Sequence, residues 1–205
     1  MIKVLVIGAA GKMGKTVCQT VLDDSILSLV AAVDAKLVAK DIGEVLGGDN
    51  LDLIIDDSLE KSLQSAMPDV AVDFTHPRAV MDNIRICLKH DINMVVGTTG
   101  ITQDNLEEIR SLIRSSKSNL FIAPNFAIGA VLMMKFAQSA VKHFDSAEII
   151  ELHHDKKADS PSGTALKTAE IMAESSSTPI RSAHSEESVA GARGGKYKGV
   201  HIHSV

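Results

Sequence analysis

The chain has 205 residues, of which 45% are hydrophobic, 23% charged and 3% aromatic. This length allows one large domain or two modest ones with a largely aliphatic core. A net charge of −5 excludes a general attraction for nucleic acid or an anionic membrane, so any bound anion requires a local site. No apolar run reaches the about 20 residues of a membrane span, and no leader pattern precedes the first predicted strand, so we expect a cytoplasmic protein.

The first part of the sequence alternates short apolar runs with amphipathic segments. Short runs rich in β-branched residues are typical of buried strands, and longer runs of period 3.6 are typical of helices. This alternation predicts βαβ units and a parallel sheet. The polar stretch 35–51, which contains three glycines, is predicted to be a mobile loop. Strands are predicted at residues 1–7, 27–34, 51–56, 69–74, 92–97 and 119–124, and helices at 12–22, 58–66, 77–90 and 102–115, the last with Thr102 as N-cap.

The pattern changes after residue 126. The second part is predicted to contain a helix at 127–143, a strand at 146–154, a helix from about 163 to 174 and an alternating strand at 199–205. We therefore predict an α/β protein with a Rossmann-type dinucleotide-binding domain over 1–126, its parallel sheet covered by helices on both faces. A substrate-binding and catalytic α+β domain is predicted over 127–205. The last residue falls inside a strand pattern, so this second domain is expected to be incomplete.

A glycine-rich segment, GAAGKMG, lies between the first predicted strand and the first predicted helix. A dinucleotide fold needs small residues there, because the turn is tight and the helix N-terminus must approach the pyrophosphate. The spacing of Gly8, Gly11 and Gly14 is G-x-x-G-x-x-G rather than the commoner G-x-G-x-x-G, and an ordinary turn is the alternative. Asp34 ends the second strand twenty residues after Gly14, where a carboxylate meets the adenosine ribose. The segment therefore predicts a nicotinamide dinucleotide site.

The residues around this loop leave the choice between NADH and NADPH open. Asp34 favours the free ribose of NADH, whereas Lys12 and Lys36 are close enough in sequence to attract a 2′-phosphate. Use of both cofactors is the hypothesis. The segments FTHP (74–77) and GTTG (97–100) follow strand ends at the same edge of the sheet, where ligands bind, although each is alternatively an ordinary turn.

The run ELHHDKKADSPSGTA at residues 151–165 contains the most reactive side chains. Neighbouring histidines on a strand point to opposite faces, so His153 and His154 are poor joint ligands and no metal site is predicted. Two imidazoles beside an ammonium group suit the binding of an anion and the supply of a proton near neutral pH. The segment 161–164 then opens a helix whose N–H groups form a second anion site. A small substrate with two carboxylates is predicted, with a solvated polar loop as the alternative.

Together these motifs resemble the dihydrodipicolinate reductase (4-hydroxy-tetrahydrodipicolinate reductase) family of the diaminopimelate and lysine pathway. The resemblance spans the chain through GAAGKMG, VDFTHP, VGTTG, APNFAIGA, ELHHDKKADSPSGTA and GVHIHSV. It implies an oxidoreductase that uses NADH or NADPH to form tetrahydrodipicolinate, and a homotetramer built on the substrate-domain sheet in full-length members. The cofactor positions that it implies are Gly8, Ala9, Ala10, Gly11, Lys12, Met13, Asp34, Gly97, Thr98, Thr99, Ala123, Pro124, Asn125 and Phe126.

The same resemblance implies His153 as proton donor and Lys157 as catalytic lysine, with the substrate carboxylates bound by His154, Gly163 and Thr164. Many members carry arginine where this sequence has Ala35, which weakens the expectation of an NADPH preference. Family chains extend further, so the assembly and turnover of this chain stay open. One rival is another Rossmann dehydrogenase, acting on an amino-acid semialdehyde, which would have no reason to carry the 151–165 segment. The other is a non-catalytic nucleotide sensor, which would be expected to lose the His–Lys pair.

Overall fold

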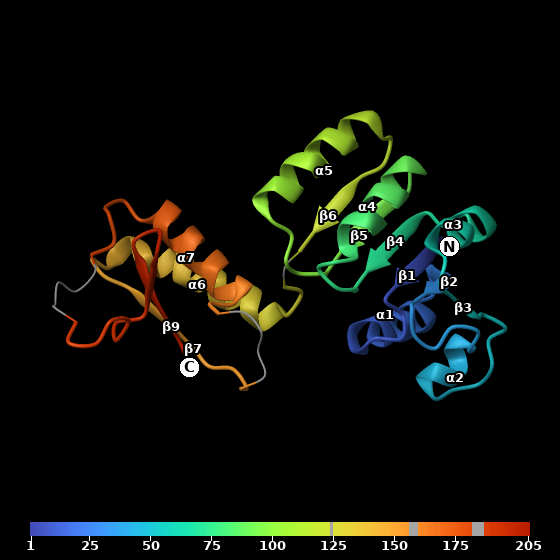
Figure 1. The fold of residues 1–205 in the computed structure, drawn as a ribbon, viewed down its shortest axis with the longest axis horizontal. Coiled ribbons are helices and arrows are strands. Elements are labelled where there is room, and N and C mark those ends of the chain that lie inside the picture. The colour runs from blue at the N-terminus through green and yellow to red at the C-terminus, as the bar shows by residue number, and fades with distance from the viewer. Residues whose placement is uncertain (124, 156–159, 182–186) are drawn as a thin grey trace. The chain divides into compact units, whose positions relative to one another are not determined.

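The computed structural model describes every residue except 124, 156–159 and 182–186. The chain divides into two compact units, Met1–Ala123 and Pro124–Val205 (Figure 1). Within the described part of the chain, no helix is both long and apolar enough to cross a membrane.

The first unit contains a six-stranded parallel sheet in the order β3-β2-β1-β4-β5-β6. This order confirms the predicted Rossmann-type sheet, and the order reverses between β1 and β4, where doubly wound sheets bind ligands. Its strands are β1 (Ile2–Ile7), β2 (Leu27–Val33), β3 (Ile55–Asp56), β4 (Val70–Asp73), β5 (Asn93–Val96) and β6 (Leu120–Ile122). Its helices are α1 (Lys12–Asp23), α2 (Ile42–Leu46), α3 (Leu59–Ala66), α4 (Val80–Lys89) and α5 (Gln103–Ser115).

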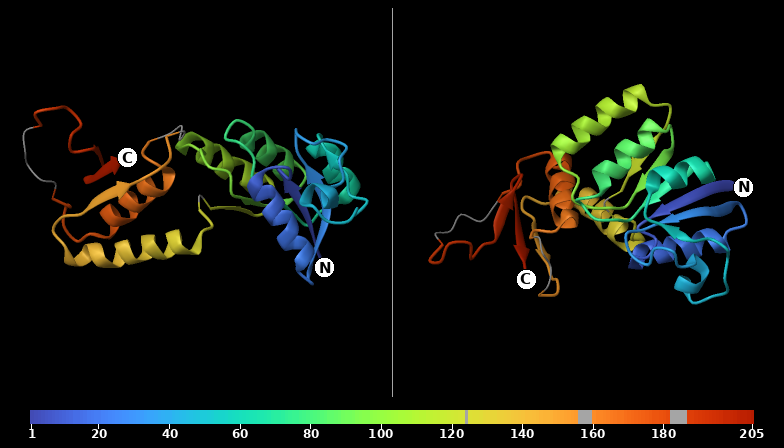
Figure 2. Two further views of the ribbon diagram at one scale, coloured as in Figure 1. Left: turned by 90° about the horizontal axis from the view of Figure 1, so that it is seen from below. Right: turned by 45° about the vertical axis from the view of Figure 1, so that its right-hand side comes forward.

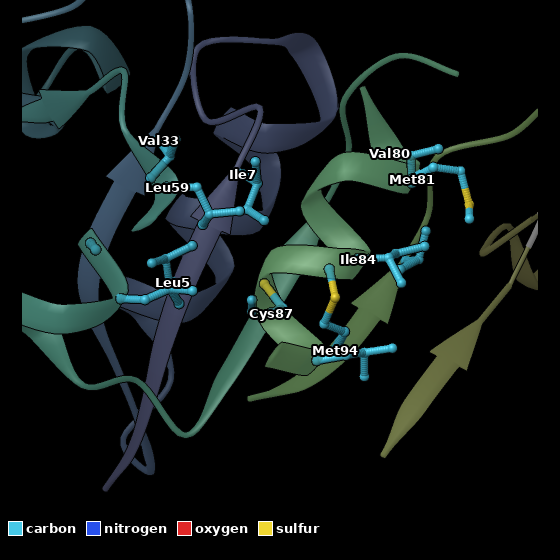
Figure 3. Close-up of a cluster of buried hydrophobic side chains, with 14 of the residues drawn as sticks. Leu5, Ile7, Val33, Leu59, Val80, Met81, Ile84, Cys87 and Met94 are labelled. Carbon is cyan, nitrogen blue, oxygen red and sulfur yellow. The ribbon is translucent and has the colours of Figure 1, made fainter. Parts of the chain in front are cut away.

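Helices cover both faces of this sheet. Successive side chains of β1 point to opposite faces and belong to two different apolar clusters. Leu5 and Ile7 belong to the cluster formed with α3, α4 and α5, which Figure 3 shows in close-up. Val4 and Val6 belong to the cluster on the other face, formed with α1 and α2. The same separation of α1 from α4 and α5 by the sheet can be followed in Figure 2. These two aliphatic layers fix the carboxyl ends of the strands, where the candidate site lies.

The stretch 35–51 differs from the predicted mobile loop, because it contains α2. The buried Asp41 caps this helix by accepting hydrogen bonds from the N–H groups of Gly43 and Glu44. The same carboxylate accepts hydrogen bonds from the N–H groups of Leu51 and Leu53, which links the start of α2 to the end of the segment. Burial opposes the charge of Asp41, but these bonds prevail and lower its pKa. This carboxylate thus orders the segment together with the apolar face that α2 packs into the core.

The second unit packs one long helix against a three-stranded sheet in the order β7-β9-β8, and a second long helix packs against the first. Strands β7 and β9 are parallel, and β8, which the sequence did not predict, is antiparallel to β9. A small core joins Val200 and Ile202 of β9 to Ala169 and Met172 of α7. The elements are α6 (Ile128–Ala140), a 3₁₀ turn η1 (Val141–His143), β7 (Glu148–Glu151), α7 (Gly163–Ser175), β8 (Gly195–Tyr197) and β9 (Val200–Ser204).

Candidate functional site

The glycine loop makes the closest backbone approaches of the first unit. Gly8 has φ +83°, and a Cβ there would lie 2.4 Å from the carbonyl oxygen of Phe74. A Cβ on Gly14 would lie 1.9 Å from the carbonyl oxygen of Gly8, so α1 can begin against β1 only without that side chain. No side chain caps α1 at Gly11, and the N–H group of Lys12 has no acceptor within the described part of the chain. The loop therefore presents a helix N-terminus that fits a pyrophosphate.

Asp34 follows β2, and its carboxylate reaches the glycine loop. Oδ2 accepts the N–H group of Ala10 at 2.9 Å, and Oδ1 accepts the N–H group of Lys36 at 2.8 Å. Each carboxylate oxygen has a second lone pair, so these bonds leave capacity for ribose hydroxyls. Ala9 is buried beneath the loop, whereas Lys12 and Met13 are exposed at the start of α1. The predicted loop residues and Asp34 thus lie together.

A buried carboxylate, Asp73 at the end of β4, organises the next two loops. Its Oδ1 accepts the hydroxyl groups of Thr98 at 2.6 Å and Thr75 at 2.8 Å, and its Oδ2 accepts Nδ2 of Asn83 on α4 at 2.8 Å. The N–H group of Thr75 also donates to Oγ1 of Thr98 at 2.7 Å. The loops after β4 and β5 are therefore held to each other by one fully buried side chain.

Phe74 completes this arrangement by lying against both glycine-containing loops. A Cβ on Gly97 would lie 2.1 Å from the Phe74 ring, and the Phe74 carbonyl is the atom that excludes a side chain at Gly8. Gly8, Gly97 and Thr98 are thus brought to one edge of the sheet, while Thr99 is exposed beside them. The sequence singled out the two loops but gave no role to Asp73 or Phe74. A carboxylate ending a short apolar strand was the available signal for Asp73.

The predicted cofactor residues 123–126 straddle the boundary between the two units. Ala123 extends β6 by donating its N–H group to the carbonyl oxygen of Val96 at 3.0 Å. Pro124 lies outside the described residues. In the second unit, Nδ2 of Asn125 donates to Oγ1 of Thr164 at 3.2 Å, and Phe126 is exposed. A residue predicted to bind cofactor therefore contacts one predicted to bind substrate.

The second unit has a pocket of about 470 Å³ between α6, β7 and α7. One part of its wall is apolar, with Met133 and Met172 among the lining residues. The polar part contains Glu151, His153 and Thr164, together with Ser162. No cluster of His, Cys, Asp and Glu in the described part of the chain could hold a metal ion. The pocket thus combines an imidazole, a carboxylate and a helix start.

The two histidines lie beyond the end of β7, because that strand stops at Glu151 rather than running to residue 154. His153 still pairs along β9, donating its N–H group to the carbonyl oxygen of Val205 at 2.9 Å. The His153 side chain lines the pocket, and the exposed His154 does not contribute to its lining. Lys157, the predicted catalytic lysine, lies outside the described residues.

Helix α7 begins at Gly163, as predicted, with Ser162 as its N-cap. The N–H group of Ser162 donates to Glu151, and that of Ala165 donates to Oγ of Ser162. The N–H groups of Gly163 and Thr164 have no hydrogen-bond acceptor among the residues that the structure describes. These two groups are therefore the ones at this helix start that are open to an anion.

The fold and these two sets of residues define a class, the two-domain oxidoreductases that bind a nicotinamide dinucleotide on a Rossmann sheet. Family comparison gives the particular group. Residues 2–126 match the family model for the N-terminal part of dihydrodipicolinate reductase, and residues 129–205 match the model for its C-terminal part. The chain belongs to the dihydrodipicolinate reductase family, which confirms the resemblance seen in the sequence.

Individual relatives agree with this assignment. A 4-hydroxy-tetrahydrodipicolinate reductase of Listeria innocua is 48% identical over 99% of this chain, which spans 78% of that protein. A dipicolinate-bound dihydrodipicolinate reductase from Paenisporosarcina sp. TG-14 is 41% identical with a TM-score of 0.76, and the match covers 100% of this chain and 78% of that one. An amine dehydrogenase from Mycobacterium smegmatis, 22% identical with a TM-score of 0.63, covers 75% of this chain and 48% of its own, and shares the fold alone.

Proposed function

We propose that this chain reduces 4-hydroxy-tetrahydrodipicolinate to tetrahydrodipicolinate with NADH or NADPH, a step of diaminopimelate and lysine biosynthesis. The observation that carries the proposal is the pocket in which His153 and the start of α7 share one wall. Family membership supports the reaction, and the dipicolinate named for the Paenisporosarcina structure supports a small dicarboxylate as ligand. The proposal includes a cytoplasmic location, because the step belongs to amino-acid biosynthesis.

The dinucleotide is assigned to residues 1–126. The uncapped start of α1 receives the pyrophosphate, and Asp34 receives the adenosine ribose. The loop from Gly97 to Thr99, held by Asp73, lines the nicotinamide end. When bound, the reduced nicotinamide supplies a hydride. The close fit of the glycines and the open N–H group of Lys12 at the start of α1 agree with such a ligand.

The substrate is assigned to residues 127–205. The N–H groups of Gly163 and Thr164 bind one carboxylate of the substrate. His154 is a further contact to the substrate carboxylates. Loss of the 4-hydroxyl group as water gives the conjugated imine that is reduced, and His153 donates a proton to the carbon next to the one that is reduced. Lys157 offsets the negative charge that develops during the reaction. The negative charge of a dicarboxylate is thereby met by backbone N–H groups, an imidazole and the Lys157 ammonium group.

The test is a coupled assay in which freshly made product of dihydrodipicolinate synthase is offered with each reduced cofactor. We expect oxidation of the cofactor that depends on the synthase product. His153→Gln and Lys157→Ala should each lower turnover by about 10²–10⁴-fold, the contribution of acid–base or electrostatic catalysis. Near-normal turnover in either variant would remove that residue from the mechanism.

Cofactor use is measured in the same assay. Similar Michaelis constants for NADH and NADPH would support dual use, because Asp34 opposes and Lys12 attracts a 2′-phosphate. A preference of about a hundredfold, roughly 2.7 kcal/mol, would end that hypothesis. Activity on an amino-acid semialdehyde instead would favour the rival dehydrogenase, and dinucleotide binding without any turnover would favour a sensor.

A further inference from the structure

Glu151, the last residue of β7, is the centre of a hydrogen-bond cluster that joins three elements of the second unit. Its Oε1 accepts the N–H group of Ser162 at 2.8 Å and the hydroxyl group of Ser204 at 2.7 Å. Its Oε2 accepts the hydroxyl group of Ser162. Because Ser162 caps α7 and Ser204 ends β9, one carboxylate fixes the helix start against the sheet.

The Glu151 carboxylate is charged, although only 10% of its side chain is exposed. Burial opposes the charge, but the hydrogen bonds from Ser162 and Ser204 outweigh it and lower the pKa of Glu151. A negative charge beside a site for a dicarboxylate substrate repels that substrate. A charged Glu151 at this place therefore requires a favourable interaction that outweighs the repulsion.

The imidazole of His153 provides a favourable interaction for the Glu151 carboxylate. Its Nδ1 lies 3.8 Å from Oε2 of Glu151, which is an ion-pair distance and too long for a direct hydrogen bond. Such contacts commonly tighten when substrate binds. With Nδ1 toward the carboxylate, Nε2 occupies the opposite edge of the ring. In many functional histidines a carboxylate at one nitrogen fixes the tautomer and leaves the other nitrogen to act.

We infer that Glu151 is a positioning residue, which holds His153 with Nδ1 protonated and fixes the carboxylate-binding start of α7 through Ser162. The inference rests on the proposed function, because it gives both partners their task in that reaction. Glu151 belongs to the histidine motif at 151–165, and the sequence predicted no role for it.

The first test reads the tautomer directly and needs no turnover. Nitrogen NMR of the imidazoles in the full chain, with His153 assigned by its absence in His153→Gln, should show the neutral ring protonated on Nδ1. In Glu151→Gln the preference should shift toward the Nε2-protonated form. Gln keeps an oxygen for Ser162 and Ser204 and differs mainly in charge, so the fold should survive. An unchanged tautomer ratio would overturn the inference.

Glu148→Gln is the matched control, because Glu148 lies on the same strand and also neighbours a histidine. Its Oε2 is 2.9 Å from Nε2 of His203, and no hydrogen bond joins it to Ser162. We expect the His153 tautomer ratio to stay at its wild-type value in this variant. A change as large as that of Glu151→Gln would mean that any charge lost from β7 has the effect, and would contradict the inference.

The second test uses kinetics. Glu151→Gln should lower kcat about 10- to 100-fold, as expected when the partner of a functional histidine is removed, with the Michaelis constant for the dinucleotide unchanged. In the His153→Gln background, Glu151→Gln should have little further effect on kcat, because the imidazole through which Glu151 acts is absent. Full additivity of the two losses would assign Glu151 a structural role alone. An inactive wild-type chain would contradict the proposed function, whereas an active wild type with a normal Glu151→Gln would contradict this inference only.

Discussion

At the scale of single residues, two glycines in this chain differ in what surrounds them. A Cβ on Gly14 would lie 1.9 Å from the carbonyl oxygen of Gly8, whereas a Cβ on Gly129 in α6 would meet nothing within 4 Å. A backbone carbonyl cannot move aside as the end of a flexible side chain can. Gly14 is therefore required by the packing of α1 against β1, and Gly129 is not.

This contrast predicts opposite outcomes for the same substitution. Gly14→Ala should displace the glycine loop, lower the thermal unfolding temperature and weaken dinucleotide binding at least tenfold. Gly129→Ala should leave binding unchanged and stabilise α6 by up to about 0.5–1 kcal/mol, because alanine restricts the unfolded chain. Fluorescence titration with NADH and thermal unfolding measure both effects. Equal affinities in the two variants would show that the loop does not bind the dinucleotide.

Residue by residue, the sequence located the loops of the site but not what holds them. The glycines, Asp34 and the Ser162–Thr164 helix start follow rules of local spacing, so they could be predicted. Asp73 and Glu151 act through partners that are distant in sequence: Thr98, Asn83, Ser162 and Ser204. Such partners become visible only when strands are placed side by side. The positions of Pro124 and Lys157, which lie outside the described residues, stay predictions.

At the scale of elements, α7 is tied to the sheet by an ion cluster as well as by its core. Glu170 accepts hydrogen bonds from Lys167 at 2.8 Å and from Lys198, beyond β8, at 2.6 Å. These bonds lower the pKa of Glu170 from its ordinary value of 4.5 to about 2. A carboxyl group whose pKa is lower in the folded than in the unfolded state stabilises the fold above the unfolded value.

The contribution of Glu170 should therefore be complete above about pH 5 and disappear as the pH falls from 4.5 toward 2. The measurement is the difference in unfolding midpoint between wild type and Glu170→Gln across this range. Glu107→Gln, at an exposed position of α5, is the control for the loss of one carboxyl group. A Glu170 difference that grew on acidification would have the wrong sign for this account.

The predictability of the elements follows from their periodicity. The apolar strands β1, β2, β4 and β5 and the amphipathic helix α5, with its Thr102 capping box, were predicted within a few residues. Helix α2 was missed because it has only five residues and depends on the Asp41 carboxylate as well as on its short apolar face. Strand β8 was missed because all three of its residues are exposed and only pairing with β9 defines it.

At the scale of the whole molecule, the second unit leaves large apolar side chains exposed. Ile150 is 69% exposed on β7, Leu152 just beyond it is 74% exposed, and Phe136 on α6 is 67% exposed. Exposed apolar surface of this kind is typical of association sites. The homotetramer expected for the family, built on the sheet of the second unit, stays a proposal for this chain.

That proposal predicts a light-scattering mass near four times the 21.8 kDa of one chain. Ile150→Lys, which places a charge on the outer face of β7, should reduce the mass toward that of smaller species. Phe136→Lys on α6 is the comparison and should leave the tetramer intact if the sheet is the interface. A mass of one chain at all concentrations for the wild type would contradict the proposal.

We propose that hydride passes from a nicotinamide bound by the first unit to a dicarboxylate bound by the second. The most direct measurement offers the enzyme a reduced cofactor deuterated at the transferable position of C4, together with freshly made synthase product, and analyses the tetrahydrodipicolinate by mass spectrometry. The account predicts deuterium from the cofactor in the product, at a rate that falls about 10²–10⁴-fold in His153→Gln. Product without that deuterium, or equal rates in the two proteins, would contradict it.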